Sequence, residues 1–254
     1  MSLLTVTGLT KSYAGVQAVR DLSYDVPAGS ISGLIGPNGS GKSTSIDCIS
    51  GFLRPDEGRW SLAGLDLTGM SAHAMALAGL TRTFQTVRAY GELSLMENLC
   101  VAAQEHDGIG WWQSLRRNAM CRAADAAART RAEELLGQIN LAAYRDAPAQ
   151  VLSYGQSKLL AIAAAMMARP RLVILDEPVA GVNPTMIRQI EAIIRALNRQ
   201  GVSFLIVEHN MDFIMSLCGQ VIVLDAGQKI ADGPAAEIRR DPRVIEAYLG
   251  VAEA

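Results

Sequence analysis

Short apolar runs separated by turn residues fill the first part of the chain. Three of these runs predict strands: LLTVTGL, VRDLSYDVPAG and SISGLIG, the second ending in the turn sequence PAG at 27–29. The pattern becomes helical between Ser43 and Leu53, RPDEG interrupts it, and the hairpin-like stretch GRWSLAGLDL follows. Hydrophobic patterning therefore predicts a strand-rich N-terminal region that contains one helix.

Residues 86–150 have a different composition. They are rich in Ala and Arg, and the segment 121–140 (CRAADAAARTRAEELLGQIN) consists of strong helix formers. The most apolar run, Leu159 to Ala168, is bracketed by Lys158 and Arg169 and is shorter than the ~20 residues that cross a bilayer, so we expect a buried helix. We predict a helical subdomain over approximately 86–165 within a single domain of residues 1–254.

Beyond residue 170 the apolar runs become nearly continuous. They are RLVILDEP, VSFLIVEH and GQVIVLDAG, and such runs are typical of strands buried on both faces of a parallel sheet. Helical stretches near 184–200 and 209–218 lie between them, as in βαβ units. The pattern predicts an α/β fold class.

Composition excludes several classes of protein. The 254 residues carry a net charge of −2, which offers no basic field for nucleic acid. The cysteines at 48, 100, 121 and 218 are scattered, which argues against a disulfide frame or a zinc site and fits a reducing cytosol. The opening MSLLTVTGLTKSY lacks the features of a signal peptide. We therefore expect a soluble chain that does not cross a membrane by itself.

Residues 36–43, GPNGSGKS, match the pattern G-x-x-x-x-G-K-[ST] between a strand ending at Ile35 and a helix beginning near Ser43. In such a loop, glycines let backbone N–H groups turn toward phosphates, the lysine reaches the β- and γ-phosphates, and the hydroxyl binds Mg²⁺. The alternative, a flexible Gly-Ser loop, is disfavoured by the flanking elements. The predicted ATP-binding residues are Gly36, Pro37, Asn38, Gly39, Ser40, Gly41, Lys42, Ser43 and Thr44.

Two adjacent carboxylates end the apolar run LVILDEP. Asp176 lies at the C-terminal end of a predicted buried strand, where ligands bind in open α/β sheets, and is expected to hold Mg²⁺. Glu177 follows and is predicted to polarise the water that attacks the γ-phosphate, as a general base. The alternative is a solvated Asp-Glu turn before Pro178.

A polar segment, LSYGQ at 152–156, precedes the apolar helix. Ser153 and Gln156 have the S-x-x-Q spacing of a capping box, which satisfies free N–H groups at a helix start. On its own this spacing predicts a helix boundary and nothing more.

Taken in order, these segments resemble the ATP-binding subunits of ABC transporters. GPNGSGKST resembles the family's Walker A motif, LSYGQ its signature (usually LSGGQ) and LVILDEP its Walker B motif with the catalytic glutamate. Further matches are Tyr13 in KSYAGVQAV, Gln85 in TRTFQ, the D-loop AGVNP at 180–184 and the switch histidine His209 in IVEH. All seven occur in the family's order and cover almost the whole chain.

The resemblance implies a P-loop NTPase fold of the ABC ATPase type, with an N-terminal antiparallel β subdomain, a RecA-like parallel-sheet core and an inserted helical subdomain. It implies that Tyr13 stacks on adenine and that Glu177, His209 and Gln85 are catalytic. Mg²⁺ would be held by Ser43, Gln85 and Asp176. The signature residues that would act on a partner subunit's ATP are Ser153, Tyr154, Gly155 and Gln156.

Three positions depart from the general pattern of the family. Tyr154 replaces the third residue of the signature, and Asn183 and Asn210 stand where Asp is commoner. With RTFQ and the closing DPRVIEAYLG, the sequence is similar to the ATPases of bacterial branched-chain (hydrophobic) amino-acid importers.

That branch implies import driven by ATP hydrolysis at the cytoplasmic face of the membrane. The implied partners are a second ABC ATPase, two transmembrane permease subunits and a substrate-binding protein; a heterodimer is favoured and a homodimer stays open. Importers of another substrate such as urea, and a soluble non-transport ABC ATPase, remain alternatives. A P-loop kinase would leave LSYGQ and His209 unexplained, and a binding module without turnover is disfavoured by Glu177.

Two features match no motif of the family. Trp111 and Trp112 in GIGWWQSLRRNAM are expected either at a surface patch near lipid headgroups or a partner, or in a locally packed helix start. His73 and His106 are expected at the surface.

Overall fold

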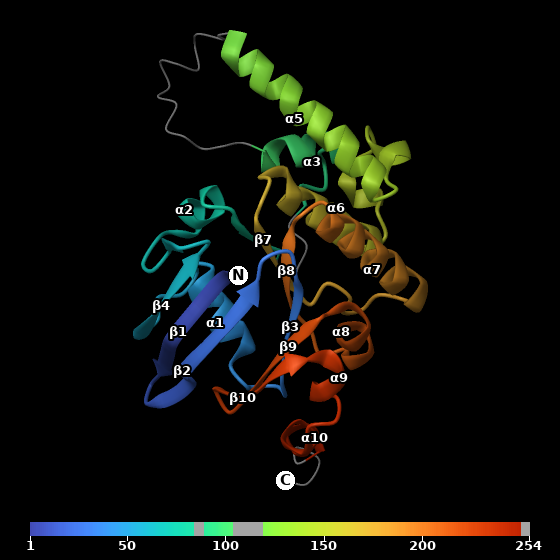
Figure 1. The fold of residues 1–254 in the computed structure, drawn as a ribbon. Coiled ribbons are helices and arrows are strands. Elements are labelled where there is room, and N and C mark those ends of the chain that lie inside the picture. The colour runs from blue at the N-terminus through green and yellow to red at the C-terminus, as the bar shows by residue number, and fades with distance from the viewer. Residues whose placement is uncertain (84–88, 104–118, 250–254) are drawn as a thin grey trace. The chain divides into compact units, whose positions relative to one another are not determined.

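The computed structural model of the chain describes residues 1–83, 89–103 and 119–249 (Figure 1). The chain divides into two compact units. One, here called the sheet unit, consists of Met1–Gln85 and Arg171–Ala254; the other, the helical unit, consists of Thr86–Pro170.

The sheet unit begins with an antiparallel sheet in the order β2-β1-β4-β5. Its strands are β1 (Ser2–Tyr13), β2 (Val16–Pro27), β4 (Glu57–Leu62) and β5 (Leu65–Asp66). Alternating burial along β2, where Leu22, Tyr24 and Val26 are buried, shows that one face of this sheet packs on a core. The strand-rich N-terminal region is confirmed.

A second sheet of the same unit has the order β10-β9-β3-β8-β7-β6. The strands are β3 (Ile31–Ile35), β6 (Leu80–Arg82), β7 (Leu172–Asp176), β8 (Ser203–Val207), β9 (Gln220–Asp225) and β10 (Gln228–Pro234). Pairing is parallel from β9 to β6, and only the edge strand β10 runs antiparallel to its neighbour among these pairs. Every residue of β3 and β8 is buried, as the unalternated apolar runs predict.

The helices of the sheet unit are α1 (Lys42–Ile49), α2 (Ala72–Leu77), α7 (Pro184–Arg199), α8 (Met211–Leu217), α9 (Ala235–Ile238) and α10 (Pro242–Leu249). Along the chain they lie between strands of the unit, except for α9 and α10, which follow the last strand, β10. Helix α7 buries a stripe formed by Ile190, Ile193, Ile194 and Leu197 at the 3–4-residue spacing of one helix face. The two helices predicted between the last strands are confirmed as α7 and α8.

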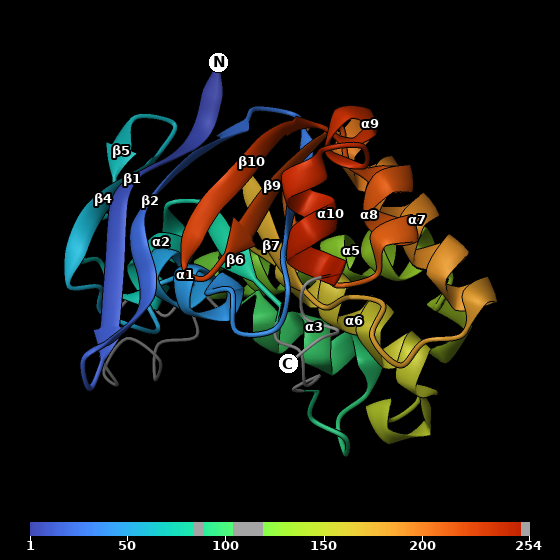
Figure 2. The same ribbon diagram turned by 90° about the horizontal axis from the view of Figure 1, so that it is seen from below.

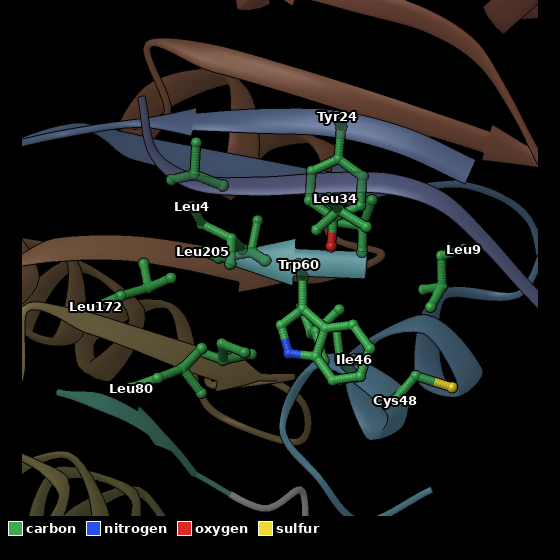
Figure 3. Close-up of a cluster of buried hydrophobic side chains, with 14 of the residues drawn as sticks. Leu4, Leu9, Tyr24, Leu34, Ile46, Cys48, Trp60, Leu80, Leu172 and Leu205 are labelled. Atoms are coloured by element: carbon green, nitrogen blue, oxygen red, sulfur yellow. The ribbon is translucent and has the colours of Figure 1, made fainter. Parts of the chain in front are cut away.

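One hydrophobic core of the sheet unit lies between its two sheets (Figure 3). Leu4 and Trp60 from the antiparallel sheet and Leu34 and Leu205 from the parallel sheet are at most 2% exposed and belong to one cluster, with Ile46 of α1 beside them. The two sheets also meet at their edges, where β2 lies beside β10 (Figure 2) and the Arg20 N–H donates to the Gly227 carbonyl at 2.8 Å. The turn after β9 is thereby tied to β2.

The helical unit contains α3 (Leu95–Ala102), α5 (Ala119–Gln138), two short 3₁₀ turns and α6 (Tyr154–Met167). Helices α3, α5 and α6 pack on one another through apolar faces that include Leu99, Leu135 and Ile162. Most of the Leu159–Ala168 run lies in α6 and forms the expected buried helix. Among the described residues, no helix combines the length and apolarity needed to span a bilayer.

Candidate functional site

The loop from Gly36 to Gly41 connects the end of β3 to the start of α1. Gly36 and Gly41 are required because neighbouring backbone lies too close for a side chain. A Cβ on Gly36 would lie 2.1 Å from the Leu224 carbonyl oxygen, and a Cβ on Gly41 would lie 2.4 Å from the Ala18 carbonyl oxygen. Gly41 also has a φ of 95° and is the N-cap of α1, a left-handed conformation that glycine adopts without strain. The loop therefore presents a helix N-terminus with its backbone held between β2 and β9.

Lys42 folds its side chain back over this loop. Its Nζ donates to the carbonyls of Gly36 (2.8 Å) and Pro37 (2.9 Å) and lies 3.4 Å from the Ser40 hydroxyl. Burial lowers the pKa of the Lys42 ammonium, and the charge of Glu177 opposes that effect. A cation thus lies at the positive end of α1, which is an arrangement suited to phosphate.

Asp176 ends β7 and is engaged by a buried arginine that the sequence analysis did not single out. Arg82 of β6 donates through Nη2 to Asp176 Oδ2 at 2.9 Å, and its Nη1 bonds Asp47 Oδ1 of α1 and lies 3.2 Å from the Ser50 hydroxyl. The side chains of Arg82 and Asp176 are 7% and 13% exposed. The feature of the sequence that could have pointed to Arg82 was its place inside TRTFQ, the segment that resembles the family's motif around Gln85.

Glu177 has an unusual backbone conformation. Its φ is 48°, in the left-handed region that non-glycine residues seldom adopt, at a typical cost of about 1–3 kcal/mol. Its N–H donates to the Val207 carbonyl at 2.9 Å, which ties the end of β7 to the end of β8. Strain of this kind persists where the surroundings over-determine the conformation, and it is concentrated at functional sites.

His209 lies two residues after β8, opposite Glu177. The His209 Nδ1 is 3.7 Å from Glu177 Oε1, and the two side chains are 62% and 28% exposed. The structure therefore brings together, at the carboxyl ends of neighbouring strands, a carboxylate and an imidazole that are both accessible from solvent.

Hard oxygen donors are available for a magnesium ion. The Asp176 carboxylate and the Ser43 hydroxyl are the oxygen types that Mg²⁺ prefers, and Mg²⁺ in nucleotide sites takes one or two carboxylates with substrate phosphates and water. Within residues 1–83, 89–103 and 119–249, no group of three His, Cys, Asp or Glu side chains is placed to hold a metal without such a ligand. The oxygen atoms of Asp176 and Ser43 are therefore suited to a magnesium ion that binds together with a nucleotide.

Other predicted site residues lie elsewhere. Tyr13 ends β1, is 49% exposed, and has the Lys11 ammonium 5.8 Å from its ring centroid. Gln85 lies outside the described residues, as do His106, Trp111 and Trp112. His73 of α2 is exposed, as expected.

The signature residues belong to the helical unit. The Ser153 hydroxyl accepts the Gln156 N–H at 3.4 Å, and Gln156 Oε1 accepts the Ser153 N–H at 2.9 Å, so the predicted capping box is confirmed. Tyr154 is 51% exposed, and the Lys158 ammonium is 5.5 Å from its ring centroid. The aromatic residue that departs from the family pattern is thus presented at the surface of this unit.

The two asparagine departures are both helix caps. Asn183 accepts the Met186 N–H at 3.0 Å at the start of α7, and Asn210 accepts the Phe213 N–H at 3.1 Å at the start of α8. Asn and Asp are nearly equivalent N-caps, so the local geometry is retained.

Comparison with known proteins agrees with this arrangement. The family model described as ABC transporter matches residues 19–180. The chain belongs to the ATP-binding cassettes of the ABC transporter family. This ABC ATPase hydrolyses ATP and has the fold class that the sequence predicts, with an antiparallel sheet, a parallel-sheet core and a helical insertion.

Relatives that match over the full length indicate which branch of the ABC transporter family this chain is similar to. The chain is 38% identical to the high-affinity branched-chain amino acid transport ATP-binding protein BraF of Pseudomonas aeruginosa, and 36% identical to LivG of Escherichia coli, with 98% of each chain covered in both cases. A second family model, branched-chain amino acid ATP-binding cassette transporter, matches residues 228–254. Among solved structures, a nucleotide-free ATP-binding cassette from an ABC transporter superposes with a TM-score of 0.85 at 32% identity, covering 98% of this chain and 99% of that one.

Proposed function

We propose that this ABC ATPase drives the import of branched-chain or other hydrophobic amino acids through separate membrane permease subunits. The observation that carries the catalytic part is the Glu177–His209 pair, 3.7 Å apart at the ends of β7 and β8, in the same unit as the phosphate loop. The names of the full-length relatives support the choice of substrate.

MgATP binding is assigned to the N-terminal edge of α1 and to the end of β7. The loop 36–44 surrounds the phosphates with its backbone N–H groups (Pro37 has none), Lys42 binds the β- and γ-phosphates, and Tyr13 stacks on adenine. Ser43 and Asp176 would hold the magnesium ion, with Gln85 as a further ligand, and the bound ion would supply neutralisation of charge on the phosphate oxygens.

Hydrolysis is assigned to the pair at the strand ends. Glu177 accepts a proton from the attacking water as that water forms a bond to the γ-phosphorus and the bond to the bridging oxygen of ADP breaks. His209 donates a hydrogen bond to the γ-phosphate and stabilises its charge. Phosphoryl transfer depends mainly on positioning and charge stabilisation, which agrees with a strained and fixed Glu177.

The signature completes the site of another subunit. Ser153, Tyr154, Gly155 and Gln156 at the start of α6 face the γ-phosphate bound by a second ABC ATPase, so two chains close on two ATP molecules. We favour a non-identical partner over a second copy. The assembly includes two permeases and a substrate-binding protein, and the ATPase lies at the cytoplasmic face of the membrane.

The test is reconstitution of the complete transporter in proteoliposomes. We expect ATP-dependent uptake of labelled leucine, and no uptake when Glu177→Gln replaces the parent ATPase. Uptake of labelled urea without leucine would overturn the substrate and leave the ATPase roles intact. Normal ATP hydrolysis that never drives uptake would instead favour a soluble, non-transport ATPase.

A further inference from the structure

Glu208, the residue that follows β8, carries a fully buried carboxylate with a side-chain exposure of 0%. Its Oε1 accepts the N–H of Val179 at 2.9 Å. Its Oε2 accepts the N–H groups of His209 at 3.0 Å and Asn210 at 3.2 Å. The proposed mechanism assigns no role to this side chain, although three backbone donors converge on it.

These three hydrogen bonds join two different loops. Val179 lies two residues after Glu177 in the loop that follows β7, whereas His209 and Asn210 lie in the loop that follows β8. The hydrogen bond from the Glu177 N–H to Val207 is a second link between the same strand ends. The backbone on both sides of the Glu177–His209 pair is therefore held by one buried side chain.

The chemistry of the contact requires a carboxylate. Both oxygens of an ionised carboxylate are acceptors only, which matches three N–H donors on two sides. Glutamine would turn an amide N–H toward one of the loops, and an apolar residue would leave buried N–H groups without acceptors, at about 1–3 kcal/mol for each. Glu208 is thus suited to orienting two loops rather than to filling the core.

We propose that Glu208 is a positioning residue that sets the separation of the Glu177 carboxylate and the His209 imidazole. It acts through the backbone of the two loops, and its Oε2 also lies 3.9 Å from His209 Nδ1. The inference rests on the roles proposed above for Glu177 and His209. The left-handed conformation of Glu177 needs such support, because a residue at φ 48° relaxes when its surroundings loosen.

The first experiment compares Glu208→Gln with the parent in ATP hydrolysis and nucleotide binding. We expect kcat to fall about tenfold to a hundredfold, as for a displacement near 1 Å at a catalytic group. The affinity for a fluorescent ATP analogue should stay within twofold, because the phosphate loop is untouched. The control is Ser203→Ala at the opposite end of β8, where a buried hydroxyl accepts the Gly29 N–H at 2.8 Å. This control should keep kcat within twofold.

A second measurement reports the position of His209 directly. The chain has three histidines, so ring resonances in a ¹H–¹³C spectrum can be assigned by single substitutions. Glu208→Gln should displace the His209 resonance and leave that of His73 unchanged. Ser203→Ala should move neither. Because Glu208 Oε2 is 3.9 Å from His209 Nδ1, loss of charge alone could shift this resonance. Glu208→Asp keeps the charge and should shift the resonance too; an unmoved His209 resonance in Glu208→Asp would contradict the positioning role.

If Glu208→Gln does not fold, Glu208→Asp replaces it in the measurement of ATP hydrolysis. It keeps both acceptor oxygens but is one methylene shorter, so it cannot span both loops, and kcat should fall at least fivefold with unchanged nucleotide affinity. The inference is overturned if a folded Glu208 variant keeps the parent kcat, or if Ser203→Ala loses as much activity. If Glu177→Gln hydrolyses ATP like the parent, the proposed function of the pair fails instead.

Discussion

In the sheet unit, the carboxylate of Asp176 is held by Arg82, which lies 94 positions earlier in the chain, whereas in the helical unit Ser153 and Gln156 bond each other across three positions. The first contact needs the folded sheet, and the second forms with the first turn of α6. The conformation of the signature is therefore set by residues close in sequence, whereas that of the hydrolytic site is set by residues that only the fold brings together. Changes in the sheet unit should affect this ATPase on its own, and changes in the signature should affect mainly its association.

The largest effect is expected from Glu177→Gln. Losing the general base should lower ATP turnover about a thousandfold, with ATP binding retained and an ATP-bound dimer stabilised. Phosphate release and size-exclusion chromatography with MgATP measure the two effects. The matched control is Glu191→Gln in the half-buried pair with Arg195 on α7, which lies away from the phosphate loop and should hydrolyse ATP normally. Turnover of Glu177→Gln within twofold of the parent would remove Glu177 from its proposed role.

Arg82→Met should destabilise the sheet unit. Asp176 is mostly buried, so removing its partner leaves a carboxylate without compensation, and unfolding free energy should fall by about 3 kcal/mol. Chemical denaturation measures this loss.

The control lies in the helical unit, where Arg145 is 50% exposed and pairs with Glu133 and Asp146. Arg145→Met should change stability by less than about 1 kcal/mol. Equal losses in the two variants would contradict the contrast between the units.

Gly36→Ala should weaken ATP binding about a hundredfold, close to 3 kcal/mol. The new Cβ would lie 2.1 Å from a backbone carbonyl, so the loop between β3 and α1 must move. Gly64→Ala in the turn between β4 and β5 is the control, because its Cβ meets nothing within 4 Å, only its φ of 84° resists the change, and it lies outside the phosphate loop. Titration with a fluorescent ATP analogue should rank Gly64→Ala much closer to the parent; the reverse order would exclude the steric explanation.

The smallest effect on the isolated chain is expected from Ser153→Arg. Loss of the N-cap should cost about 1 kcal/mol of stability, and ATP binding by the monomer should stay within twofold. ATP-driven dimerisation should nevertheless be blocked, because the arginine side chain occupies the start of α6. Weakened monomer binding with normal dimerisation would refute the proposal that the signature acts on a partner's ATP.

Sequence alone predicted many of the elements, because strand patterns and helix caps depend on local signals, but it did not predict the short elements α2 and β6. The strands β7 and β8 follow from unalternated apolar runs, and the capping box of α6 from a three-residue spacing. Arg82 and Glu208 were missed because their roles depend on partners that only the fold brings near: Asp47 and Asp176 for one, Val179 for the other. A charge next to an apolar strand does not reveal which loop it will hold.

The asparagine caps of α7 and α8 have a consequence for acid solutions. An aspartate cap loses its charge and gains an O–H donor when it is protonated near pH 4, whereas the amide oxygens of Asn183 and Asn210 keep the same hydrogen-bonding character throughout that range. Both helices begin in the loops that carry Glu177 and His209. The two cap hydrogen bonds therefore do not change with proton concentration, so mild acid should act on this enzyme through ionisable side chains such as Glu208, which accepts the Asn210 N–H at 3.2 Å, while both caps stay in place.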